Sequence, residues 1–169
     1  ADIDFRYGWL AFVALIIQLA VVYLPALGND MAIGLLAVSH GLLIVLALAN
    51  RRLPGLAIVG AGLLANVVAM IVNGGFMPVT PLALGRARLG ELVQQTALEQ
   101  QILGAKDVIL PREQIRLWVL TDTLAIGAPV NTVLSIGDMF LAAGIFWMFQ
   151  KAMNREVIHQ RDSELELMT

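Results

Sequence analysis

Four long apolar runs constrain this chain more than any other feature of its sequence. They cover residues 8–27, 31–49, 53–72 and 130–150. A helix needs about 20 apolar residues to cross about 30 Å of hydrocarbon, and each run has about that length. The whole chain is 59% hydrophobic and 14% charged, whereas a soluble domain is roughly 45–50% apolar and 25% charged. We predict an all-α, polytopic membrane protein whose four transmembrane helices form one four-helix bundle.

The first run is expected to be a retained span and not a cleaved signal peptide. Its apolar part is longer than the usual signal-peptide core of about 7–15 residues, and no clear cleavage site follows it.

The positions of lysine and arginine predict the orientation of the spans. The turn at 28–30 has no cation, and the cations near the other span ends fall together on the opposite side: Arg6, Arg51, Arg52, Lys151, Arg155 and Arg161. We therefore expect both termini, including the tail 151–169, in the cytoplasm of a bacterium, with the protein in the cytoplasmic (inner) membrane. Residues 73–129 would then be an extracytoplasmic insertion.

The insertion contains residues that are typical of the ends and the beginnings of helices. The glycines of NGG at 73–75 predict the end of the third helix, and prolines 78 and 81 favour extended backbone just before them. Thr80 is a candidate N-cap with proline at the first helical position. We expect an amphipathic helix from Pro81 to about Leu103, which either lies in the outer interface or caps the bundle, and another short helix starting at Pro111.

Each predicted span carries one polar side chain near mid-depth, and these make up an intramembrane polar belt: Gln18, His40, Asn66 and Asp138. Such groups are costly in hydrocarbon and should face inward. Two interpretations stay open, namely hydrogen bonding between helices and a binding site or proton path. His40 is also a candidate ligand for a pigment or haem, although the second histidine, His159, lies in the tail. With two histidines and no cysteine, no metal site is expected.

Asp138 lies inside an otherwise apolar segment and has two explanations. The motif SIGD at 135–138 fits a capping box, in which Ser135 and Asp138 bond each other's backbone N–H groups at the start of a helix. Alternatively, the helix starts near Val130 and buries Asp138 about two turns deep. We favour an ionised, structural Asp138 whose partners are backbone N–H groups, Ser135 and Asn73.

A stripe of small residues, Ala57, Ala61, Ala65 and Ala69, recurs every four positions in the third run. Such a stripe allows a neighbouring helix to approach closely. The overlapping GAGLLA at 60–65 matches a dinucleotide-binding fingerprint, but it lies inside a span and lacks the acidic residue that should follow.

NGGFMPVT (73–80), LTDTLAI (120–126) and VLSIGDMFLAAGIF (133–146) occur in this order along the chain. On these motifs, nearly the whole chain resembles a family of small bacterial four-span membrane proteins known only as a domain of unknown function. The resemblance implies the four-span architecture and brings no activity with it. It also implies one structural centre on the outer side: Asn73, Gly74, Gly75, Met77, Pro78, Ser135, Gly137 and Asp138.

No nucleophile–base pair, metal cluster or nucleotide loop is evident, so no catalytic residue is predicted. The leading hypothesis is a non-catalytic accessory or assembly subunit of a larger membrane complex, for example an energy-transducing one. Its partners would be the lipid bilayer and other membrane-protein subunits; a net charge of −2 gives no reason to expect nucleic acid. The alternatives are a small transporter or proton conduit using the polar belt, and a lipid-modifying enzyme with Asp138 as base.

Overall fold

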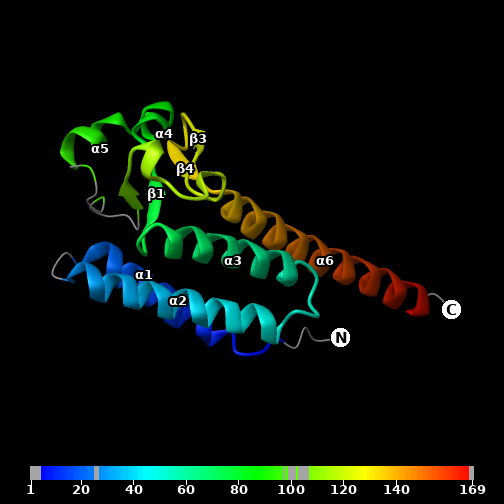
Figure 1. Ribbon diagram of the computed structural model, residues 1–169. Helices are drawn as coiled ribbons and strands as arrows, with labels where there is room; N and C mark the ends of the chain where they lie inside the picture. Colours follow the sequence, from blue (N-terminus) through cyan, green and yellow to red (C-terminus); the bar gives the residue numbers. More distant parts are fainter. Residues whose placement is uncertain (1–4, 25–26, 97, 99–101, 103–106, 168–169) are drawn as a thin grey trace.

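Four long helices lie side by side in a computed structural model of the chain, with a small cap of short elements at one end (Figure 1). The structure describes residues 5–24, 27–96, 98, 102 and 107–167, with side chains in the last helix up to Asn154. The long helices are α1 (Trp9–Tyr23), α2 (Asn29–Ala49), α3 (Leu56–Val72) and α6 (Ile136–Leu167). The prediction of a mostly helical protein is confirmed.

The long helices are arranged as a row in chain order. α1 packs on α2, α2 on α3, and α3 most extensively on α6. Among the described residues, α1 makes no comparable contact with α6, so the row does not close into the predicted bundle. The turn between α2 and α3 lies at the opposite end from the cap (Figure 1).

Helix length does not support the prediction of four full-length spans. Within the described ranges, α2 is the one helix long and apolar enough to cross a membrane by length and composition, with 21 residues and a mean hydropathy of 2.4. α1 and α3 have 15 and 17 residues. Pro25 follows the end of α1 in the sequence, and proline disfavours helix in the residue before it. α3 starts late because Gly55, its N-cap, has left-handed backbone with φ of 86°.

The prediction of a fourth helix from residue 130 is wrong at its beginning. Residues Thr132–Leu134 form a strand, β4, and α6 starts at Ile136. The helix then continues to Leu167, so most of the predicted tail is helical. The side chains of Arg155, His159 and Arg161 lie outside the described part of that helix.

The cap (residues 77–134) corrects the all-α prediction, because it contains two small sheets. β1 (Met77–Val79) pairs in parallel with β2 (Asp107–Ile109), with Pro78 opposite Val108. β3 (Leu124–Ile126) pairs antiparallel with β4, with Ala125 opposite Val133. The helical elements are α4 (Pro81–Arg86), α5 (Gly90–Gln95), and the 3-10 turns η1 (Arg112–Gln114) and η2 (Trp118–Leu120).

The predicted amphipathic helix of the insertion begins as expected but is broken. Thr80 caps α4 through its Oγ1, which accepts from the Ala83 N–H at 3.1 Å. The helix ends at Arg86, and Arg88 has a left-handed φ of 61°, so α5 starts as a separate helix. The expected end near Leu103 lies outside the described residues.

Two apolar clusters hold the cap and attach it to the helices. The first lies inside the cap, where Val79, Ala83 and Ile109 are buried together. The second lies beneath it, where Phe76, Met77 and Val108 pack with Leu36 of α2 and Met70 of α3. The cap therefore shares a core with the helix row at the end where α3 leads into β1 (Figure 1).

Candidate functional site

Three polar side chains join α3 to the start of α6. Asn66 Nδ2 donates to Asp138 Oδ1 at 2.8 Å, and the Ser135 hydroxyl donates to Asn66 Oδ1 at 2.8 Å. Ser135 and Asp138 also form the reciprocal bonds of a capping box. The Asp138 N–H donates to Ser135 Oγ, and the Ser135 N–H donates to Asp138 Oδ2, both at 3.0 Å. The structure therefore agrees with the capping-box explanation of Asp138, and not with a helix that starts near Val130 and buries Asp138 about two turns deep.

Two pairs of glycines allow α3 and α6 to approach closely around this cluster. A Cβ added at Gly62 would lie 2.5 Å from the Gly137 carbonyl oxygen, and one added at Gly144 would lie 2.6 Å from the Gly55 carbonyl oxygen. Both glycines of each helix are seven residues apart, which puts them on one face of the helix. The close approach brings Asn66 within hydrogen-bonding distance of α6.

A second polar cluster joins α1 to α2. Gln18 Nε2 donates to Ser39 Oγ at 3.3 Å, and the Ser39 hydroxyl donates to the Leu36 carbonyl at 2.9 Å. His40 Nδ1 lies 2.8 Å from the same carbonyl. A carbonyl only accepts, so this bond requires the proton on Nδ1, which makes Nε2 the acceptor nitrogen of the neutral ring. The residues of the predicted polar belt are therefore divided between two clusters. Gln18 and His40 lie in the α1–α2 cluster, and Asn66 and Asp138 lie in the α3–α6 cluster.

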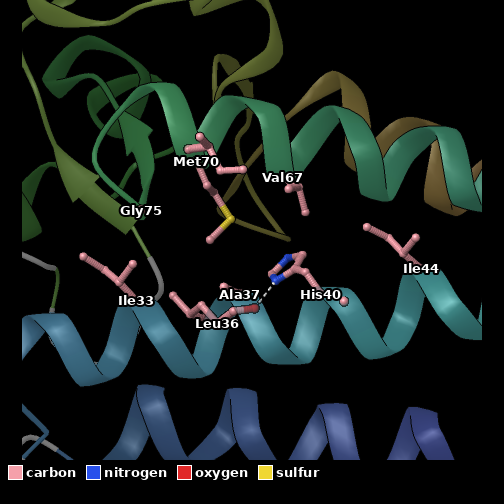
Figure 2. A pocket seen from close by; sticks show the side chains of 10 residues that line it. Ile33, Leu36, Ala37, His40, Ile44, Val67, Met70 and Gly75 are labelled. Atoms are coloured by element: carbon pink, nitrogen blue, oxygen red, sulfur yellow. Dashed lines mark hydrogen bonds between the residues drawn. The ribbon is translucent and has the colours of Figure 1, made fainter.

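His40 also lines a cavity of about 270 Å³ between α2 and α3. Figure 2 shows its ring rising from α2 into the space below Val67 and Met70 of α3. The other walls are apolar apart from glycine backbone. A haem or chlorin is larger than the drug-sized ligands that occupy pockets of about 300–1,000 Å³, so such a ring would extend well outside this cavity.

The residues predicted to form one outer-side centre fall into two groups. Ser135, Gly137 and Asp138 belong to the cluster with Asn66, whereas the NGG turn stands apart from it. The prediction that Asn73 bonds Asp138 is wrong, because Asn73 Nδ2 donates to the Ala69 and Arg116 carbonyls at 2.7 and 2.8 Å and its Oδ1 accepts from the Arg116 N–H at 2.8 Å. Asn73 therefore ties the end of α3 to the cap.

The rest of the NGG–MP motif forms the bend from α3 into the cap. Gly74 and Gly75 have φ of 91° and 102°, as the helix stop predicts. A Cβ at Gly75 would lie 2.6 Å from the Ile33 side chain on α2. Met77 and Pro78 follow in β1, where both are buried.

The alanine stripe does not face α6. Ala57 and Ala61 are exposed, Ala65 is half-buried and Ala69 is buried under the cap. The close contact of α3 within the chain uses Gly55 and Gly62 instead. Their spacing of seven residues, repeated by Gly137 and Gly144, is the signal in the sequence that could have found this contact.

Asn50 is a structural residue that the sequence analysis missed. It is 3% exposed, donates to the Arg6 and Leu46 carbonyls and accepts from the Arg6 N–H, all at 2.8 Å. Arg6, just before α1, is thereby held against the turn between α2 and α3. Within the described residues, no three potential metal ligands gather.

These features define a class of protein: a row of four apolar helices, joined in pairs by buried polar clusters and closed at one end by a small α/β cap. The model of a family of unknown function, DUF5317, matches residues 2–150 of the chain. The chain therefore belongs to that family. No curated protein and no solved structure matches it.

Proposed function

We propose that the protein is a four-span integral membrane protein that serves as a non-catalytic accessory or assembly subunit of a larger membrane complex. The observation that carries the membrane placement is an inverted distribution of polarity. Side chains of Ser39, His40, Asn66 and Ser135 are between 0% and 4% exposed. Large apolar side chains instead point outward from all four long helices.

The outward apolar surface is extensive. Phe12, Ile71 and Phe146 are 70%, 70% and 64% exposed, and further large apolar residues of the four long helices are more than half exposed: Leu15, Ile16, Val45, Leu48, Leu64 and Met139. A monomer in water rarely exposes an apolar patch of more than a few hundred Å². Only 33% of the most apolar window of α2 is buried, whereas the core helix of a water-soluble domain is mostly buried. A hydrocarbon solvent accounts for both facts.

Two of the proposed spans, α1 and α3, are shorter than the hydrocarbon layer is thick, so the bilayer has to adapt to their length. At 1.5 Å per residue, α1 is about 22 Å long and α3 about 25 Å, somewhat less than the hydrocarbon thickness of about 30 Å. Local bilayer thinning or flanking apolar residues accommodate such a mismatch at modest cost. The first 14 residues of α6 are apolar apart from Asp138, and its continuation past Lys151 lets that lysine reach the headgroups.

The accessory role is supported by how the polar groups are used. Gln18, Ser39 and His40 bond within the α1–α2 pair, and Asn66, Ser135 and Asp138 bond within the α3–α6 pair. The Gln18–Ser39 bond and the bonds of Asn66 hold helices together, whereas His40 bonds the Leu36 carbonyl of its own helix. The open row leaves helix faces available for other subunits, including the α3 face that carries the exposed Ala57 and Ala61.

Native mass spectrometry after gentle detergent extraction tests this role. We expect the chain to leave the membrane in a defined complex with other membrane proteins at fixed stoichiometry. A homo-oligomer would favour the transporter or conduit, and a lone monomer from membranes at native expression levels would refute the accessory role. Retention in the membrane pellet after alkaline carbonate washing tests the membrane placement separately.

A further inference from the structure

We propose that a groove at the junction of the cap and α6 binds an anionic phospholipid, whose phosphate pairs with Arg86 and whose acyl chains lie on the apolar wall of the groove. This inference goes beyond the accessory role and rests on the proposed membrane placement. Three features carry it: the elements that form the groove, the chemistry of its walls and its depth in the bilayer.

The groove has a volume of about 510 Å³ and is formed where α4, β3 and β4 meet the start of α6 (Figure 1). Arg86 is the last residue of α4 and lies beside the end of β3, since a Cβ added at Gly127 would lie 3.8 Å from the Arg86 carbonyl oxygen. Leu124 of β3 is paired across the strands with Leu134 of β4, and both line the groove. Met139, in the first turn of α6, also lines it. The groove therefore joins the cap to the beginning of a long helix.

The walls combine one cation with apolar side chains. Arg86 is exposed, and within the part of the chain that the structure describes it is the one charged residue that lines the groove. Leu124, Ile126 and Met139 are 39%, 41% and 55% exposed, so their apolar surface is accessible to a ligand. A guanidinium pairs with a phosphate through two parallel N–H···O bonds. A ligand with a phosphate at one end and hydrocarbon at the other suits both kinds of wall, and a phospholipid is such a ligand.

The charge of the walls favours an anionic phospholipid over a zwitterionic one. Among the described residues, no acidic side chain lines the groove. The ammonium group of a zwitterionic lipid would therefore find no counter-charge in the groove, and Arg86 would repel it.

In the proposed topology the groove lies at the depth of the lipid phosphates. α6 would enter the hydrocarbon near its start at Ile136, and Met139 lies about 5 Å further along the helix at 1.5 Å per residue. The headgroup layer extends about 5–7 Å outside the hydrocarbon on each side. Arg86, in the cap, would therefore lie in the headgroup layer, and Met139 would lie beside the acyl chains. A phospholipid of the outer leaflet reaches both residues.

Two arginines of the cap provide a matched pair of variants. Arg86 and Arg88 are two positions apart and both are exposed, but only Arg86 lines the groove. Arg86→Gln and Arg88→Gln therefore remove the same charge from the same part of the surface, and neither substitution changes a buried side chain.

The probe is dioleoylphosphatidylglycerol, titrated into the detergent-solubilised full chain and followed by native mass spectrometry, which counts the lipids that stay bound. The first lipid should bind the wild type and Arg88→Gln with the same Kd, and Arg86→Gln about fivefold more weakly. That factor corresponds to about 1 kcal/mol, the contribution of one cation near an anionic lipid surface. Dioleoylphosphatidylcholine, with the same acyl chains, should bind the wild type more weakly. Inorganic phosphate at millimolar concentration should not displace the lipid, because it makes no contact with the apolar wall.

Four results would overturn the proposal: an unchanged Kd in Arg86→Gln, an equal loss of affinity in Arg88→Gln, equal binding of phosphatidylcholine, or displacement of the lipid by inorganic phosphate. If the protein stays in the carbonate-washed membrane while any of these is observed, the lipid site is refuted and the membrane placement is not. Loss of the protein from the washed membrane would refute the placement, and the lipid site with it.

Discussion

Replacing Asp138 tests whether the cluster with Asn66 and Ser135 stabilises the fold. Its two carboxylate oxygens accept from different donors, Oδ1 from the Asn66 amide and Oδ2 from the Ser135 N–H. Asp138→Leu removes both acceptors and leaves a buried amide and a buried backbone N–H without them. Asp138→Asn keeps one acceptor oxygen, and its amide can donate to Asn66 if that side chain flips, so it should be the milder change.

The expected loss follows from the bonds removed. Loss of a helix cap costs about 0.5–2 kcal/mol, and a hydrogen bond between membrane helices averages about 0.6 kcal/mol, with a maximum near 1.7. Asp138→Leu should therefore lower the free energy of unfolding by about 1–4 kcal/mol. Asp138→Asn should lower it by about 1 kcal/mol, since a charge-assisted bond becomes a neutral one.

The assay is reversible unfolding in mixed micelles, followed by circular dichroism. Asp30→Leu is the control, because Asp30 is an exposed carboxylate in the first turn of α2 with no capping role. It should change stability by less than about 1 kcal/mol. A double-mutant cycle with Asn66→Ala should give a coupling energy of at least about 0.5 kcal/mol with Asp138. An Asp138→Leu protein as stable as the wild type would refute the structural role of the cluster.

Three further predictions concern other contacts. Gly62→Ala should destabilise by about 1–3 kcal/mol in the same assay, because its Cβ overpacks the α3–α6 contact, whereas Gly34→Ala should be neutral or slightly stabilising; equal effects would contradict the close approach. Asn50→Ala should speed hydrogen exchange at the Arg6 amide, which donates to the Asn50 side chain, and an unchanged rate would count against that docking. Thr80→Ala should cost about 1 kcal/mol and raise exchange in α4, with no change in α1; an unaffected α4 would argue against the cap.

The parts of the site that could be predicted are those specified locally. The capping box depends on two residues three positions apart, and the end of α3 depends on glycines directly after the helix, so both could be predicted from short motifs. The partnership of Asn66 with Ser135 and Asp138 joins residues 69 and 72 positions apart. It depends on the α3–α6 packing that the glycine pairs create, and no local pattern specifies it.

The cap was the least predictable part of the fold. Its strands have three residues each, too few for a period of two to be recognised. β1 and β2 are also about 30 positions apart, and their pairing depends on packing over Leu36 and Met70. The apolar runs identified all four long helices, but hydropathy also counts apolar residues in turns. Leu53 and Val130 were therefore assigned to helices that start later, at Leu56 and Ile136.

The most direct test of the membrane topology is the labelling of single cysteines, because the natural chain has none. Four exposed positions are suitable: Gly28 in the turn after α1, Glu113 in the cap, Arg52 in the turn after α2 and Lys151 in α6. In intact bacteria, a membrane-impermeant maleimide should label cysteines at Gly28 and Glu113 and should label Arg52 and Lys151 only after the cells are opened. Labelling of Glu113 and Arg52 from the same side of an intact membrane would contradict the four-span account.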